Sequence, residues 1–185
     1  SETCHKYGLY LFLDGARLGY GLAAPDNDLT LPEIAALCDV FYIGGTKVGA
    51  LFGEAVVIKN PELAQDFRYL IKQNGGMLAK GRLLGLQFDA LFTDGLYQEI
   101  SAHAIAMAEK LREAFTAKGY NYLAPNRTNQ IFVIVPDAHL AKISEQFEYS
   151  YDQRIDATHS CVRFCTSWAT KEENVDALIR CVEKL

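Results

Sequence analysis

Two short apolar runs, each ended by glycine, most strongly constrain how this chain folds. The first run, "GLYLFLD" at 8–14, ends in Asp-Gly, and the second, "DVFYIGG" at 39–45, ends in two glycines. Between them, "LTLPEIAALC" at 29–38 has a capping residue, an early proline and apolar residues at helical spacing. Strand, helix, strand in this order predicts parallel strands, because a parallel pair needs a crossover connection. With a further strand at 53–60, we expect an α/β fold with a mostly parallel sheet.

The remainder of the chain predicts a second, smaller domain. A helix at 61–73 and a long helical stretch from Lys80 are followed by strand, helix, strand, strand and helix. This order is typical of a small α+β domain with an antiparallel sheet. The helical pattern dips at "TDG", residues 93–95, and we place the boundary there. The predicted domains are therefore 1–95, part of an α/β large domain, and 96–185, the small α+β domain.

The composition is that of a globular protein and argues against several kinds of partner. Half of the 185 residues are hydrophobic, 22% are charged and the net charge is −5. Without a cluster of Lys and Arg we expect no nucleic-acid partner, and without an apolar run of ~20 residues we expect no membrane span. Five scattered cysteines without a CxxC pair indicate reduced thiols and a cytoplasmic location. His159, Cys161 and Cys165 lack the full ligand set of zinc, so we predict no metal site.

Asp14 and Lys47 are the first candidates for chemistry, because each follows a predicted parallel strand. Ligands of open α/β sheets bind outside the carboxyl ends of the strands. Taken singly, Asp-Gly is also favourable turn chemistry, and a loop lysine also keeps its ammonium group in water. Taken together, they are the pair that pyridoxal phosphate chemistry requires: a carboxylate for the ring nitrogen and a lysine for a Schiff base. Arg17 adds a cation beside them, and Arg163, on an apolar strand, suits a substrate carboxylate.

Two segments partly match nucleotide-binding motifs, but neither matches its motif in full. "YIGGTKVG" lacks the GxxxxGK[ST] spacing, and Val48 stands where a P-loop needs a hydroxyl group. "GYGLAA" at 19–24 matches the loose form of the dinucleotide fingerprint, but it begins well beyond its strand, and Pro25 follows where a helix should continue. An oxidoreductase that binds a nicotinamide cofactor stays an alternative, and binding of that cofactor would test it.

Three segments carry a family resemblance: "LFLDGARLGYGL", "CDVFYIGGTKVGALFGEAVVI" and "KQNGGMLAKGRLLG". They resemble the threonine aldolase and β-eliminating lyase family of pyridoxal-phosphate-dependent enzymes, which have the aspartate aminotransferase fold (fold type I). The resemblance implies an amino-acid substrate and a homodimer or homotetramer whose sites are completed across a subunit interface. It implies that residues 1–95 are the C-terminal part of the cofactor-binding large domain.

The resemblance also implies a role for each candidate residue. Lys47 would form the Schiff base with pyridoxal 5'-phosphate, and Asp14 would pair with the pyridinium nitrogen. Arg17 would lie near the ring hydroxyl group and the substrate carboxylate. Arg163 would clamp the substrate carboxylate from the small domain.

The sequence departs from the family pattern in two places. Lys72 matches a lysine before the family's glycine run, but Lys80 or Arg82 would have to replace an arginine that reaches a neighbouring subunit's phosphate. The family's phosphate-binding loop and its ring-stacking residue lie upstream of the strand that ends at Asp14, so the chain resembles the C-terminal half of such an enzyme.

The resemblance favours a lyase that cleaves a β-hydroxy-α-amino acid, such as threonine, into glycine and an aldehyde. Two alternatives stay open. One is a β-eliminating lyase that acts on another amino acid. The other is a catalytically inactive fragment that lacks the phosphate-binding half.

Overall fold

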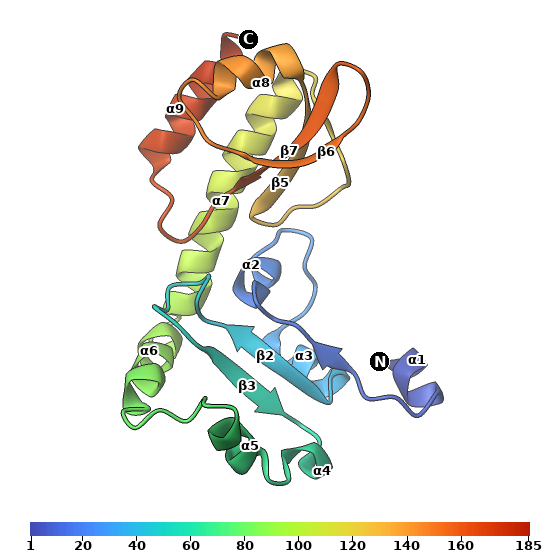
Figure 1. Ribbon diagram of the computed structural model, residues 1–185, viewed down its shortest axis with the longest axis vertical. Coiled ribbons are helices and arrows are strands. Elements are labelled where there is room, and N and C mark those ends of the chain that lie inside the picture. The colour runs from blue at the N-terminus through green and yellow to red at the C-terminus, as the bar shows by residue number, and fades with distance from the viewer. The chain divides into compact units, whose positions relative to one another are not determined.

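The computed structural model describes residues 1–185, which divide into two compact units. Unit 1 comprises Ser1–Leu22 and Asn27–Glu99, and unit 2 comprises Ala23–Asp26 and Ile100–Leu185. Helix α7 (Leu96–Ala117) begins in unit 1 and continues in unit 2 (Figure 1). The boundary predicted from the sequence lies at the start of this helix. No helix combines the length and apolar character needed to cross a membrane.

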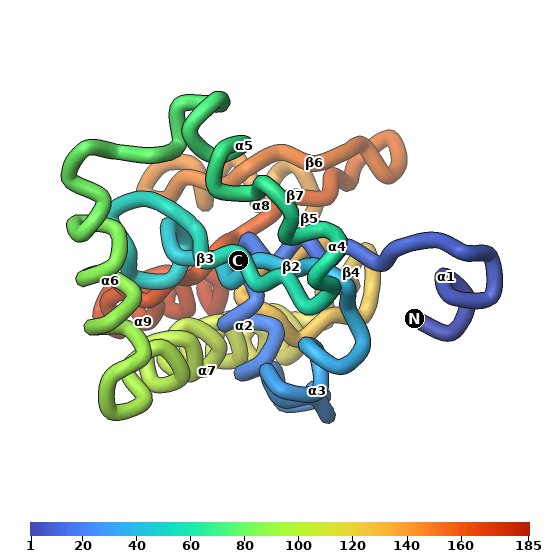
Figure 2. Tube along the Cα trace, turned by 90° about the horizontal axis from the view of Figure 1, so that it is seen from below, coloured from blue at the N-terminus to red at the C-terminus, as the bar shows by residue number.

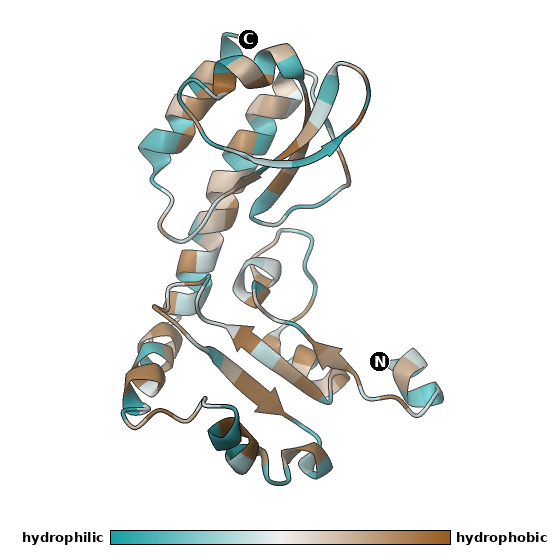
Figure 3. Ribbon diagram, viewed as in Figure 1, coloured by the Kyte–Doolittle hydropathy of each residue, from teal (hydrophilic) through white to brown (hydrophobic).

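Unit 1 is built on a three-stranded sheet with the order β1-β2-β3. Before α7, its elements in chain order are α1 (Glu2–Lys6), β1 (Phe12–Leu13), α2 (Leu18–Leu22), α3 (Leu31–Leu37), β2 (Val40–Gly44), β3 (Glu54–Ile58), α4 (Pro61–Ala64), α5 (Phe67–Gln73) and α6 (Arg82–Phe92). Helix α1 buries no residue and projects from the rest of this unit in both views (Figures 1 and 2). Hydrophobic residues dominate all three strands (Figure 3).

The strands β1 and β2 are parallel, as the sequence predicts, and β3 runs antiparallel to β2. The link between β2 and β3, residues 45–53, is too short for the crossover that a parallel pair requires. Helix α3 lies in the crossover from β1 to β2. The predicted cap is present: Thr30 and Glu33 form a capping box, and the Thr30 N–H donates to the Glu33 carboxylate at 2.7 Å.

Two elements of unit 1 have different bounds in the structure from those predicted from the sequence. The strand predicted at 8–14 is reduced to β1, because only Phe12 and Leu13 pair with residues of β2. The helix predicted at 61–73 is divided into α4 and α5 at Asp66, whose φ of 57° is left-handed and interrupts the helix. Aspartate tolerates this conformation better than most residues.

Unit 2 is an α+β unit with an antiparallel sheet of order β4-β5-β7-β6, as predicted. Its elements after α7 are β4 (Asn121–Tyr122), β5 (Gln130–Pro136), α8 (Asp137–Ile143), β6 (Ser150–Arg154), β7 (His159–Cys165) and α9 (Glu172–Glu183). Strand β5 alternates buried and half-buried residues, so one face of the sheet forms the core. Residues of α7, α8 and α9 pack on that face, among them Leu111, Leu140 and Leu178.

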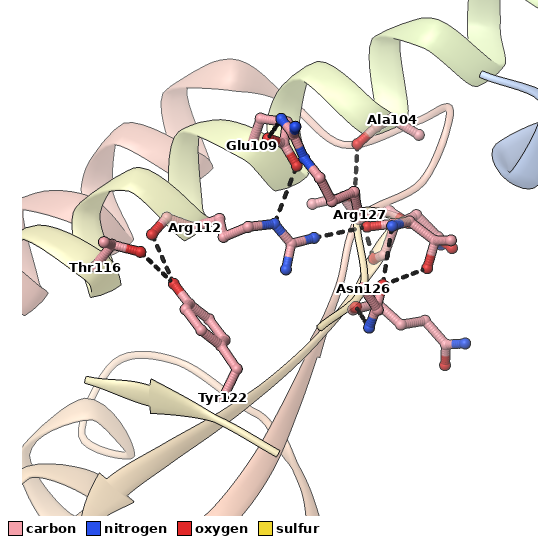
Figure 4. Close-up of polar contacts among 11 residues, drawn as sticks. Ala104, Glu109, Arg112, Thr116, Tyr122, Asn126 and Arg127 are labelled. Atoms are coloured by element: carbon pink, nitrogen blue, oxygen red, sulfur yellow. Dashed lines mark hydrogen bonds and ion pairs between the residues drawn. The ribbon is translucent and has the colours of Figure 1, made fainter. Parts of the chain in front are cut away.

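A polar network joins α7 to the loop before β5 (Figure 4). The Glu109 carboxylate accepts hydrogen bonds from Arg112 at 3.0 Å and from Arg127 at 2.5 Å. Arg112 also donates to the Thr128 carbonyl at 3.0 Å, and its own carbonyl accepts from the Tyr122 hydroxyl at 2.7 Å. The loop is therefore held against the helix by charged groups.

Candidate active site

Asp14 lies at the carboxyl end of β1, and its exposed carboxylate is held by two donors. The Tyr42 hydroxyl and the Ala16 N–H, the latter at 3.1 Å, both donate to Oδ1. These two hydrogen bonds, the one from Tyr42 above all, lower the pKa of Asp14, and the positive charges of Lys47 and Arg17 lower it further. The group is therefore a carboxylate at neutral pH.

Lys47 lies on a tight turn directly after β2. The N–H groups of Val48 and Ala50 donate to the Gly45 carbonyl at 2.9 and 3.0 Å, which closes the turn. The Gly45 N–H in turn donates to the Glu54 carboxylate at 2.7 Å. Val48 is fully buried, whereas Lys47 is exposed. The valine anchors the turn, and the lysine amine is left at the surface of unit 1.

Glycines allow the two turns that carry these residues to approach closely. A Cβ atom on Gly15 would lie 1.7 Å from the Tyr42 carbonyl oxygen, and one on Gly44 would lie 2.4 Å from the Ala16 carbonyl oxygen. The Gly44 N–H donates to the Gly15 carbonyl at 2.9 Å. Any side chain at either glycine would force the turns apart, so "DG" and "GG" serve packing as well as turn formation.

Arg17 completes the group at this edge of the sheet. It is half-buried just before α2, and its charge contributes to the lowered pKa of Asp14. The structure thus brings together Asp14, Arg17 and Lys47, as the sequence predicts for residues that follow parallel strands. Helix α2 contains most of "GYGLAA", so these glycines do not form a phosphate-binding turn between a strand and a helix.

Three tyrosines support these turns, and no pattern in the sequence distinguishes them from other tyrosines. The buried Tyr97 hydroxyl donates to the Gly44 carbonyl at 3.0 Å and accepts from the Gly19 N–H at 3.1 Å. Burial raises the pKa of Tyr97 to about 12, so this hydroxyl keeps its proton. The hydroxyl of Tyr20, a buried residue, donates to the Lys47 carbonyl. The third tyrosine is Tyr42, which holds Asp14.

Arg163 lies on β7 in unit 2, among neutral partners. It donates to the Gln130 side-chain oxygen at 3.2 Å and to the Ser150 hydroxyl at 3.4 Å. Its Nε atom is buried and has no partner. Arg163 is also one of the residues that line a hollow of about 380 Å³ in unit 2, together with Phe164 and Thr170. The guanidinium group therefore has unused capacity to bind an anion.

The other cations of the family pattern lie on exposed positions of unit 1. Lys72 is in the last turn of α5, Lys80 lies two residues before α6, and Arg82 is the first residue of α6. No group of three or more His, Cys, Asp or Glu residues is placed to hold a metal ion.

Comparisons with known proteins identify the family. The sequence profile of the beta-eliminating lyase family matches residues 1–138. A low specificity L-threonine aldolase from a Pseudomonas species is 32% identical over 182 residues, which are 96% of this chain and 51% of that protein. The solved structure of threonine aldolase from Leishmania major has a TM-score of 0.96 and 42% identity, over 99% of this chain and 54% of that chain.

A more distant structure shows how widely the fold is shared. The serine palmitoyltransferase of Sphingomonas wittichii, at 17% identity, has a TM-score of 0.68 over 99% of this chain and 48% of that chain. The predicted fold class is confirmed. The chain spans about half the length of the curated relatives it matches. Because the family profile matches most of its length, the chain belongs to the beta-eliminating lyase family.

Proposed function

We propose that the full-length protein is a pyridoxal-phosphate-dependent aldolase, which cleaves a β-hydroxy-α-amino acid such as threonine into glycine and an aldehyde. The main support for this proposal is that Asp14, Arg17 and Lys47 lie near one another beyond the carboxyl ends of the parallel strands β1 and β2. The relatives named above as threonine aldolases support the same substrate class.

The side chains of unit 1 fit this cofactor. Oδ2 of Asp14 accepts no hydrogen bond within the chain, and Lys47 is exposed. Lys47 would hold the cofactor covalently, Asp14 would pair with its ring nitrogen, and Arg17 would lie by its ring hydroxyl group. When bound, the cofactor supplies an electron sink for the electron pair left on the substrate's α-carbon. The anionic charge of Asp14 would keep the ring nitrogen protonated for that purpose.

Arg163 would bind the substrate carboxylate. Its known contacts are neutral and its buried Nε has no partner, so a carboxylate would satisfy a group that the chain leaves unsatisfied. We further propose that the protein self-associates as a homodimer or homotetramer, which sedimentation of the full-length protein would measure. A cytoplasmic location is inferred from the scattered cysteines alone and would be checked by fractionation of cells.

Product analysis tests the proposed reaction. Full-length protein with pyridoxal phosphate and threonine is expected to release glycine and acetaldehyde in equal amounts. Ammonia and a 2-oxo acid would instead indicate β-elimination, the reaction that gives the matching family its name. No product from any β-hydroxy-α-amino acid would contradict the proposal and favour a lyase that acts on another amino acid.

A further inference from the structure

Tyr42 lies beside Asp14 because of the register of two parallel strands. Leu13 pairs with Phe41, so the next position of each strand brings Asp14 and Tyr42 together. On the same face of the sheet, the Tyr42 ring packs beside the Phe12 ring, and the two ring centroids are 6.1 Å apart. The hydroxyl group is thereby directed along the sheet edge to the carboxylate.

The two oxygens of this carboxylate have different surroundings. Oδ1 accepts from both the Tyr42 hydroxyl and the Ala16 N–H, whereas Oδ2 accepts from neither. A carboxylate oxygen has two lone pairs, so Oδ1 is fully occupied by these donors. Oδ2 is the oxygen that can accept from a ligand.

The protonation states agree with these roles. The hydrogen bond to Asp14 is the main cause that raises the pKa of Tyr42 to about 12, so the hydroxyl keeps its proton and acts as donor at neutral pH. The same hydrogen bond is the main cause of the lowered pKa of Asp14. Tyr42 therefore keeps the carboxylate both charged and oriented.

We propose that Tyr42 is a positioning residue of the cofactor site: its hydroxyl fixes Asp14 through Oδ1 and leaves Oδ2 to accept from the protonated ring nitrogen. This inference rests on the proposed function and adds a residue to its site. Tyr42 acts through Asp14, so its effect must vanish when the carboxylate is absent.

A double-mutant cycle on the full-length protein tests this dependence. Binding of pyridoxal phosphate, measured by equilibrium dialysis, is expected to weaken about fivefold in Tyr42→Phe, because a hydrogen bond to a charged group is lost. In the Asp14→Ala background, the same substitution is expected to change binding by less than about twofold. Equal losses in both backgrounds, or wild-type binding by Tyr42→Phe, would overturn the inference. If Asp14→Ala itself binds like wild type, it is the proposed function that fails.

A second readout separates the hydroxyl group from the packing of the ring. Without the hydroxyl, the pKa of Asp14 rises. In Tyr42→Phe, the acid limb, which is the change in the bound cofactor's visible absorbance as the pH falls, should therefore move to higher pH. The control is Phe12→Leu, which removes the ring contact but keeps the hydroxyl and should leave that limb in place. A limb that moves in Phe12→Leu as much as in Tyr42→Phe would reduce Tyr42 to a packing role and contradict the inference.

Discussion

At Asp14 the charge of an exposed carboxylate is maintained by a tyrosine hydroxyl and a backbone N–H rather than by a direct ion pair. The cations Lys47 and Arg17 contribute less to its lowered pKa than these two hydrogen bonds do. The amine of Lys47 therefore does not have to remain paired with Asp14. Both groups are available to a ligand at the same sheet edge.

Arg163 offers a test of substrate recognition at the residue scale. In the full-length protein, Arg163→Ala should raise the KM for threonine about tenfold or more, because a charged hydrogen bond to the carboxylate is lost. Cofactor affinity, measured by dialysis, should stay near the wild-type value. The matched control is Arg154→Ala on β6, since Arg154 already pairs with Asp137 at 2.7 Å. Equal losses of substrate and cofactor affinity in Arg163→Ala would remove its carboxylate role.

Contacts between elements explain why part of the site escaped sequence analysis. The position of Asp14, Arg17 and Lys47 after two parallel strands was predictable, because glycine-ended strands and a crossover helix determine where strand ends lie. Their roles stay predictions. Tyr97 was not predictable, because it binds Gly44 across 53 positions of the chain and nothing local distinguishes it from a core tyrosine. Strand β1 was predicted too long for the same reason, since a strand extends only where a neighbour supplies hydrogen-bond partners.

The network on α7 gives a prediction about stability and pH. Burial opposes the charge of Glu109, but the hydrogen bonds from Arg127 and Arg112 outweigh it and lower the pKa of the carboxyl group. A lowered pKa in the folded state stabilises the protein above the ordinary glutamate value of 4.5, and this contribution is lost as pH falls through the folded value. Glu109→Gln should therefore reduce the free energy of unfolding by about 1–2 kcal/mol at pH 7.

Urea unfolding of the full-length protein at several pH values measures this effect. The difference between wild type and Glu109→Gln should be largest near pH 7 and should shrink as the pH falls below about 4.5. The control is Glu113→Gln, one turn further along the same helix, which removes a carboxylate of α7 that forms no ion pair within the chain. A pH-independent difference would assign the loss to packing instead of charge.

Across the molecule, several large apolar side chains of unit 1 are exposed. The side chains of Phe12 on β1 and Val56 on β3 are 59% and 47% exposed, and Leu51, between β2 and β3, is 86% exposed. The strands of this sheet consist mainly of apolar residues (Figure 3). A sheet with this pattern is typically covered on both faces. This exposure agrees with a chain that spans about half the length of the relatives it matches. The fold class was predictable because it depends on strand order, which a partial sheet retains.

Borohydride trapping shows whether Lys47 holds the cofactor. Full-length protein is incubated with pyridoxal phosphate, reduced and digested, and the modified lysine is located by mass spectrometry. We expect modification concentrated at Lys47 and absent from Lys59, an exposed lysine of the same unit that follows β3. In Lys47→Ala the trapped product should disappear. Modification spread over many lysines, or undiminished trapping in Lys47→Ala, would show that Lys47 is not the residue that holds the cofactor.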